Sequence, residues 1–158
     1  MILVTVGTQK FQMDRLLQAV DRIAQSGISG ETFFVQSGYS TYELKYCEYA
    51  AFLEKEEMEG KIGRCSILLC HAGVGSILRG LKLHKKVIVV PRMQKFGEHV
   101  DDHQVEIAES FAQAGYIKYV ENVSDLAATM DDLVGWEPKE FVSNKEKFNQ
   151  LILESIRE

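Results

Sequence analysis

Proline and cysteine are scarce in this chain of 158 residues, which contains two prolines and three cysteines. Its 12 glycines are also too few for a fibrous or low-complexity chain, so both classes are excluded. Cys47, Cys65 and Cys70 are odd in number and lack Cys-x-x-Cys spacing, which argues against a disulfide framework and a zinc site. We therefore expect a protein of a reducing cytosol, with Cys70 as a small buried hydrophobe rather than a reactive thiol.

Long hydrophobic segments are missing as well. The apolar start at residues 1–7 carries no basic flank and is too short for a signal peptide or a membrane span. Hydrophobic residues make up 46% and charged residues 26%, as in ordinary globular proteins, and the formal net charge of -5 argues against general nucleic-acid binding. We predict one folded domain over residues 1–158 that crosses no membrane.

Short apolar runs alternate with segments of helical periodicity along the chain, and several end at glycine, as at Gly7, Gly27 and Gly115. Strands are expected at residues 2–6, 32–36, 49–53, 66–70, 87–90 and 116–120. Helices are expected at about residues 16–24, 54–62, 75–83, 101–113, 124–134 with Ser124 as cap, and 144–157. This alternation predicts an α/β, Rossmann-like doubly wound fold, whose mostly parallel sheet of five or six strands has helices on both faces. Residues 136–158 would form a C-terminal linker and helix.

Three loops would lie at the carboxyl ends of the strands, where ligands bind in such sheets: residues 7–9, 71–76 and 92–104. The second loop reads His-Ala-Gly-Val-Gly-Ser between a strand and a helix, so free N–H groups and a helix dipole would converge on a phosphate. The loop lacks the Gly-Lys-Ser/Thr of a P-loop and the full G-x-G-x-x-G pattern, and Ser76 is not in a G-x-S-x-G elbow. Taken alone, the loop equally fits a tight turn without a ligand.

The joint spacing of three segments is more specific than the glycine loop. Residues 71–78, the strand that leads into Pro91-Arg92, and residues 96–104 resemble the donor-binding half of GT-B glycosyltransferases of the family 28 C-terminal type. Short stand-alone members are most similar: bacterial capsule and exopolysaccharide subunits of the galactosyltransferase type, and the soluble subunit of the eukaryotic two-part N-acetylglucosaminyltransferase of N-glycan assembly. The resemblance implies one half of a GT-B fold.

The resemblance also implies a function. The chain would be the donor-binding subunit of an inverting hexosyltransferase that moves a sugar from a UDP-sugar to a lipid-linked acceptor in capsule or exopolysaccharide biosynthesis. A membrane-anchored partner would supply the acceptor half and the catalytic base, and would hold this cytoplasmic chain at the inner membrane face. No cofactor and no metal are expected, because N–H donors and a helix N-terminus stabilise charge on the leaving diphosphate.

Site residues follow from the same resemblance. The diphosphate would be bound by Gly7, Thr8, Ala72, Gly73, Val74, Gly75 and Ser76, the sugar by His103 and Gln104, and the base by Phe52 and Leu53. Possible further site residues are His71, Arg79, Glu98 and His99. Without the family, His103 and Gln104 also fit an exposed first helical turn, Phe52 fits a core position, and His71 fits a hydrogen-bonded structural histidine.

Arg79 departs from the family pattern. The family usually carries Glu or Asp at this position, where a carboxylate accepts hydrogen bonds from the ribose, and arginine cannot accept them. Either the nucleotide sits differently, or another acid such as Glu98 substitutes, or donor binding is weakened. The last case motivates an alternative function, in which the chain is a non-catalytic binding or enhancer subunit that activates or stabilises a partner glycosyltransferase.

Overall fold

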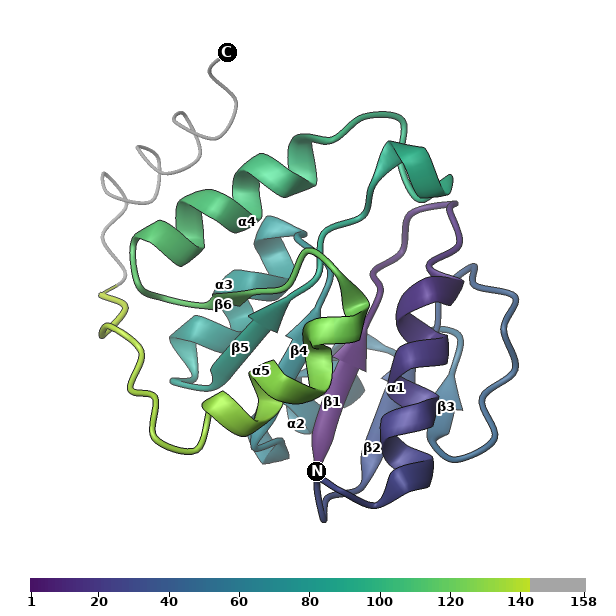
Figure 1. Cartoon of the computed structure of the whole chain (residues 1–158), viewed down its shortest axis with the longest axis horizontal. Coiled ribbons are helices and arrows are strands. Elements are labelled where there is room, and N and C mark those ends of the chain that lie inside the picture. The colour runs from purple at the N-terminus through teal and green to yellow at the C-terminus, as the bar shows by residue number, and fades with distance from the viewer. Residues whose placement is uncertain (143–158) are drawn as a thin grey trace.

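Six short strands lie side by side in one parallel sheet in the computed structural model, which describes residues 1–142 (Figure 1). Their order across the sheet is β3-β2-β1-β4-β5-β6. The strands are β1 (Ile2–Thr5), β2 (Phe33–Gln36), β3 (Glu48–Ala50), β4 (Ile67–Cys70), β5 (Lys86–Val89) and β6 (Lys118–Tyr119). The predicted doubly wound α/β fold is confirmed, and every pairing in the sheet is parallel.

The order of the strands creates a switch point between β1 and β4. The chain proceeds from β1 through β2 to β3 on one side, and from β4 through β5 to β6 on the other. Thr5 pairs with Gln36 of β2 and with Cys70 of β4, so these three strands end level with one another. In open α/β sheets the loops diverge at such a point and leave a crevice at the carboxyl edge.

Five α-helices of the described chain cover the two faces of the sheet. Helices α1 (Asp14–Ser26) and α5 (Leu126–Asp132) cover one face, and α2 (Lys55–Arg64), α3 (Val74–Lys82) and α4 (His103–Gln113) cover the other (Figure 1). Successive strand residues enter opposite apolar clusters, as Leu68 and Leu69 do, because side chains alternate between the faces of a strand. Burial on both faces explains why the strands are nearly continuous apolar runs.

The third strand is shorter than predicted, and its early end shapes the site. A strand over residues 49–53 was the expectation, but pairing stops at Ala50. The Ala51 carbonyl accepts from the Gly38 N–H at 2.8 Å and from Gln36 Nε2 at 2.7 Å instead of continuing the ladder. Phe52 and Leu53 therefore leave the sheet.

The helix expected from Ser124 begins later. A 3-10 turn, Val123–Asp125, precedes α5, and the capping side chain belongs to Asn122, whose Oδ1 accepts from the Ser124 N–H at 3.1 Å. The prediction that Ser124 caps this helix was wrong: Asp125 is the N-cap of α5, with no side-chain cap among the described residues, and Asn122 caps the turn that precedes the helix.

The bounds of two other elements also differ from the predicted ones by one or two residues at each end that moved. Helix α4 begins at His103 rather than at residue 101, and β6 takes two residues of the predicted 116–120. The terminal helix predicted at residues 144–157 lies outside the described residues. Across residues 1–142, no helix has the length and apolar character needed to cross a membrane.

Helix α3 packs very closely on the sheet at Gly80. A Cβ at this position would lie 2.7 Å from Leu68 Cδ2 and 2.8 Å from Val87 Cγ2. Both contacts are far shorter than real carbon contacts, so a larger residue would push α3 away from β4 and β5.

Gly80→Ala should therefore destabilise the protein by about 1–3 kcal/mol, the usual cost of overpacking a core. The matched control is Gly63→Ala in α2, where a Cβ would meet nothing within 4 Å, and it should be neutral or stabilising by up to about 1 kcal/mol. Urea unfolding measures both changes. Equal stabilities for the two variants would contradict close packing at Gly80.

Candidate functional site

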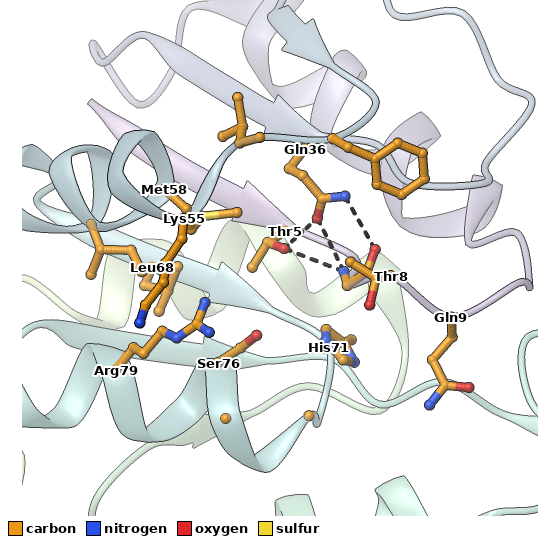
Figure 2. A pocket seen from close by; sticks show the side chains of 16 residues that line it. Thr5, Thr8, Gln9, Gln36, Lys55, Met58, Leu68, His71, Ser76 and Arg79 are labelled. Carbon is orange, nitrogen blue, oxygen red and sulfur yellow. Dashed lines mark hydrogen bonds between the residues drawn. The ribbon is translucent and has the colours of Figure 1, made fainter.

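A pocket of about 480 Å³ opens at the carboxyl ends of β1 and β4, at the switch point of the sheet (Figure 2). Helices α2 and α3 and the turns after β1 and β3 contribute to its walls. The predicted site residues that line it are Gly7, Thr8, Phe52, Leu53, His71, Gly73, Gly75, Ser76 and Arg79. Its other lining residues are Thr5, Gln9, Gln36, Lys55, Met58, Ile62 and Leu68. The structure thus gathers residues assigned to the diphosphate and the base around one pocket.

The turn after β1 is held by a buried glutamine. Gly7 has a φ of 80°, and its N–H donates to Gln36 Oε1 at 3.2 Å while its carbonyl accepts from Gln36 Nε2 at 3.1 Å. Thr5 Oγ1 donates to the same Gln36 oxygen. The Gly7 N–H is thus already used, and Thr8 supplies the polar side chain of this turn. Sequence analysis did not identify Gln36 as a site residue, because its only signal is that it is a polar residue at the end of an apolar strand.

The glycine loop ends at the N-terminus of α3, which faces the pocket. The helix starts at Val74, and no side chain of the described residues caps it. The N–H groups of Val74, Gly75 and Ser76 are in the first helical turn and so have no acceptor within the helix. The Ala72 N–H, in contrast, already donates to Gln104 Oε1 at 3.2 Å. N–H groups that could donate to an anion are therefore those at the start of α3.

The charges around the pocket have one sign. Lys55 and Arg79 are the charged side chains among its described lining residues, and no carboxylate is among them. Figure 2 shows both side chains on the wall formed by α2 and α3. Together with the positive end of the α3 dipole, they favour an anionic ligand. Lys55 was missed, because nothing in its local sequence distinguishes it from other surface lysines.

His71 contributes a neutral imidazole to the same pocket. Its ring lies against Gly7 and Gly73, where an added Cβ would come within 2.4 Å and 2.3 Å of the ring. Burial, and next the positive charge of Arg92, lower the pKa of His71 to about 4, so the ring is uncharged at neutral pH. Neither glycine can be replaced without displacing this ring.

The two residues predicted to bind the sugar lie outside the pocket lining. Gln104 is 5% exposed, and its carboxamide bonds the Ala72 N–H, the Arg92 N–H and the ring of His71. His103 is exposed, beside Asp101 and Glu106. Sugar binding by His103 and Gln104 stays a prediction.

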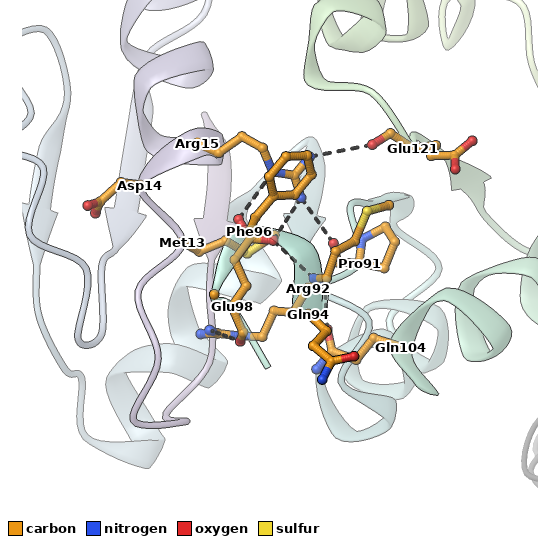
Figure 3. A network of polar contacts seen from close by, with 12 residues as sticks. Met13, Asp14, Arg15, Pro91, Arg92, Gln94, Phe96, Glu98, Gln104 and Glu121 are labelled. Carbon is orange, nitrogen blue, oxygen red and sulfur yellow. Dashed lines mark hydrogen bonds and ion pairs between the residues drawn. The ribbon is translucent and has the colours of Figure 1, made fainter. Parts of the chain in front are cut away.

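Arg92 belongs to a network of polar contacts (Figure 3) and links two loops through its hydrogen bonds. Its side chain is fully buried, and its guanidinium donates to the carbonyls of Val6, Phe11 and Glu98. The first two carbonyls belong to the loop after β1 and the third to the loop after β5. Arg92 therefore holds one loop against the other through backbone acceptors.

Glu98 belongs to the same network rather than to the pocket. It is fully buried, pairs with Arg15 at 2.9 Å, and accepts from the Met93 N–H at 3.0 Å. His99 stacks on Phe11 and pairs with Asp101 instead of lining the pocket. Glu98 is thus bonded outside the pocket lining and is not placed to act there as the substitute acid that the sequence analysis considered.

The cysteines behave as structural residues. Cys70 is fully buried, and burial raises the pKa of its thiol, which confirms its interpretation as a buried hydrophobe. Within residues 1–142, the structure contains no group of three or more His, Cys, Asp or Glu side chains placed to hold a metal ion.

The lowered pKa of His71 predicts a pH-dependent stability. The unfolded imidazole, with its ordinary pKa near 6.5, binds a proton that the folded ring binds only near pH 4, so the free energy of unfolding should fall as pH drops from about 6.5 to 4, by up to about 3 kcal/mol. His71→Gln lacks this group and should lose less stability over the same range. Urea unfolding at several pH values measures both profiles, and parallel profiles would contradict a buried neutral His71.

Comparison with known proteins agrees with this architecture. Residues 1–156 match the family described as glycosyltransferase family 28 C-terminal domain. Two curated relatives are named UDP-N-acetylglucosamine transferase subunit ALG13. The one from Candida glabrata is 45% identical over 51 residues, 32% of this chain and 24% of the relative. The one from Saccharomyces cerevisiae is 33% identical over 92 residues, 57% of this chain and 44% of the relative. The matches therefore span less than half the length of these relatives.

Solved structures share the fold. The NMR structure of ALG13 superposes with a TM-score of 0.64 at 20% identity, covering 98% of this chain and 96% of that one. The glycotransferase of kitacinnamycin superposes with a TM-score of 0.62 at 17% identity, covering 98% of this chain and 38% of that one. The strand order, the glycine turn at the N-terminus of α3 and the match over residues 1–156 lead to one conclusion: the chain belongs to the glycosyltransferase family 28 C-terminal domain family.

Proposed function

We propose that this chain is the donor-binding subunit of a two-part glycosyltransferase that moves a sugar from a UDP-sugar to a lipid-linked acceptor. The observation that carries the proposal is the N-terminus of α3, which no described side chain caps and which faces the pocket. The charged residues in the described lining of this pocket, Lys55 and Arg79, are both cationic. A diphosphate placed there would meet fixed N–H donors and positive charge, while Phe52 and Leu53 offer an apolar wall for the base.

The chemistry follows from this placement. As the acceptor hydroxyl attacks the sugar, the bond to UDP breaks and negative charge grows on the leaving diphosphate. The N–H groups at the start of α3 are oriented before the reaction begins, so they stabilise this charge without reorganisation. The base that removes the acceptor proton would come from the partner subunit, in keeping with relatives that are named as transferase subunits.

The biological setting is also a proposal. The segment from Pro91-Arg92 to residues 96–100 is similar to bacterial capsule and exopolysaccharide subunits, and in this chain it forms the network of Arg92 and Glu98 that supports the pocket. We infer a role in polysaccharide assembly at the cytoplasmic membrane face. A membrane-anchored acceptor half would be the partner.

Calorimetric titration with UDP, UMP and uridine tests donor binding. Affinity should fall in that order, because each lost phosphate removes contacts with the start of α3. Lys55→Gln and Arg79→Gln should each weaken UDP binding several-fold and reduce its salt dependence, since exposed cations act through a screened field. The control is Lys61→Gln, on the same helix as Lys55 but stacked over Phe34 outside the pocket, and it should leave UDP binding unchanged.

The same titration is repeated with the acceptor-half partner, and transfer is then followed by UDP release. If UDP binds neither to the chain nor to the complex, the donor-binding proposal fails, and a non-catalytic subunit that activates its partner becomes the better reading. Equal affinities for UDP and uridine would separately contradict recognition of the diphosphate.

A further inference from the structure

Gln104 contacts the pocket through another residue. It lies at the start of α4, 5% exposed and outside the pocket lining. Its carboxamide nevertheless reaches the ring of His71, which does line the pocket, with Nε2 of Gln104 3.2 Å from Nδ1 of His71.

Two backbone groups decide the orientation of this carboxamide. The Ala72 N–H lies 3.2 Å and the Arg92 N–H 2.9 Å from the same atom of Gln104. Both groups can only donate, so this atom must be the oxygen, Oε1. The other end of the amide is then the NH₂ group, which can only donate, and it faces His71.

The orientation of the amide decides the protonation of His71. Because the Gln104 NH₂ group donates to Nδ1, this nitrogen must present its lone pair. A neutral ring then carries its proton on Nε2. The ring is 6% exposed and feels the charge of Arg92, and both effects keep it neutral. Among the described residues no acceptor is bonded to Nε2, which lies at the Gly7 side of the ring.

We propose that Gln104 is a positioning residue: it locks His71 as the Nε2–H tautomer, so that a fixed, neutral N–H donor serves the diphosphate beside the start of α3. The identity of the ligand in this inference rests on the proposed function. In this role Gln104 acts through His71 and does not need to contact the sugar. The tautomer itself is a property of the free protein and is measured without any ligand.

Nitrogen-15 NMR of the imidazole rings in the wild-type chain provides the first test. At neutral pH, His71 should show a pyridine-type Nδ1 and a pyrrole-type Nε2. The opposite tautomer, or an imidazolium, would overturn the proposal. Failure of UDP-sugar binding would count against the proposed function and leave this measurement unaffected.

Gln104→Glu provides the second test. A carboxylate still accepts from the Ala72 and Arg92 N–H groups, but it now accepts from His71 Nδ1–H as well, so the neutral ring loses its proton at Nε2. The carboxylate also raises the pKa of His71, against the opposing charges of Arg92 and His99, which face the ring from the loop between β5 and α4. Only the protonated ring of this variant can donate from Nε2.

The expected readout is a pH profile of binding to UDP-N-acetylglucosamine, whose diphosphate keeps a constant charge in this range. Wild-type affinity should be flat from about pH 6 to 8.5, because the pKa of His71 is far below it. The Gln104→Glu variant should bind the ligand about ten- to hundredfold more weakly at about pH 8.5 than at about pH 6. This ratio corresponds to the loss of one hydrogen bond to a charged group. A loss of affinity that is equal at every pH would show a structural role only and would overturn the proposal.

Gln113→Glu, the same substitution at an exposed position of α4, is the matched control, and its profile should remain flat. If Gln104→Glu does not fold, the NMR measurement on the wild-type chain still decides which tautomer His71 adopts.

Discussion

The carboxyl edge of the sheet imposes one constraint on this protein: where strands end, backbone N–H and C=O groups lose their ladder partners in a largely buried place. Such groups must find other partners, because leaving them unpaired costs free energy. In this protein, long polar side chains form hydrogen bonds with these backbone groups. Gln36 serves Gly7 and Ala51, Gln104 serves Ala72 and Arg92, and Arg92 serves the carbonyls of the two loops that it joins. The geometry of the pocket depends on these bonds.

Among the described residues, side chains bond some of the backbone N–H groups around the pocket and leave others without a partner, and this difference defines the candidate site. The Gly7 and Ala72 N–H groups, which these side chains occupy, flank the pocket, whereas no side chain within residues 1–142 caps the first turn of α3. Two glycines admit the His71 ring between the turns, and the close packing at Gly80 holds α3 against the sheet. A rigid frame thus leaves a small set of donors oriented toward one place, which is what charge stabilisation in a transfer reaction requires.

Much of the fold could be predicted from the sequence, because strands buried on both faces are continuous apolar runs that alternate with segments of helical periodicity. The edge strand β3 was the exception, since Glu48–Ala50 is largely exposed and carries little apolar signal. The pocket turns were predictable because each follows a buried strand. Gln36, Lys55 and the interior position of Glu98 were not, because their partners or neighbours lie far away in the chain. Local periodicity says nothing about which distant backbone group a polar side chain meets.

The net charge of this protein differs in sign from the charge at its pocket, and screening makes the local charge the one that a ligand senses. The whole chain carries a formal charge of -5, yet the charged side chains among the described residues that line the pocket are Lys55 and Arg79. At physiological ionic strength, fields from exposed charges fade over about 8 Å, so a ligand in the pocket senses the nearby cations and the α3 dipole more than the distant carboxylates. If the pocket binds the donor as proposed, the arginine at position 79 would strengthen attraction for the diphosphate and would offer no acceptor to the ribose. Recognition in this chain would then rest more on phosphate than on sugar hydroxyls of the nucleoside.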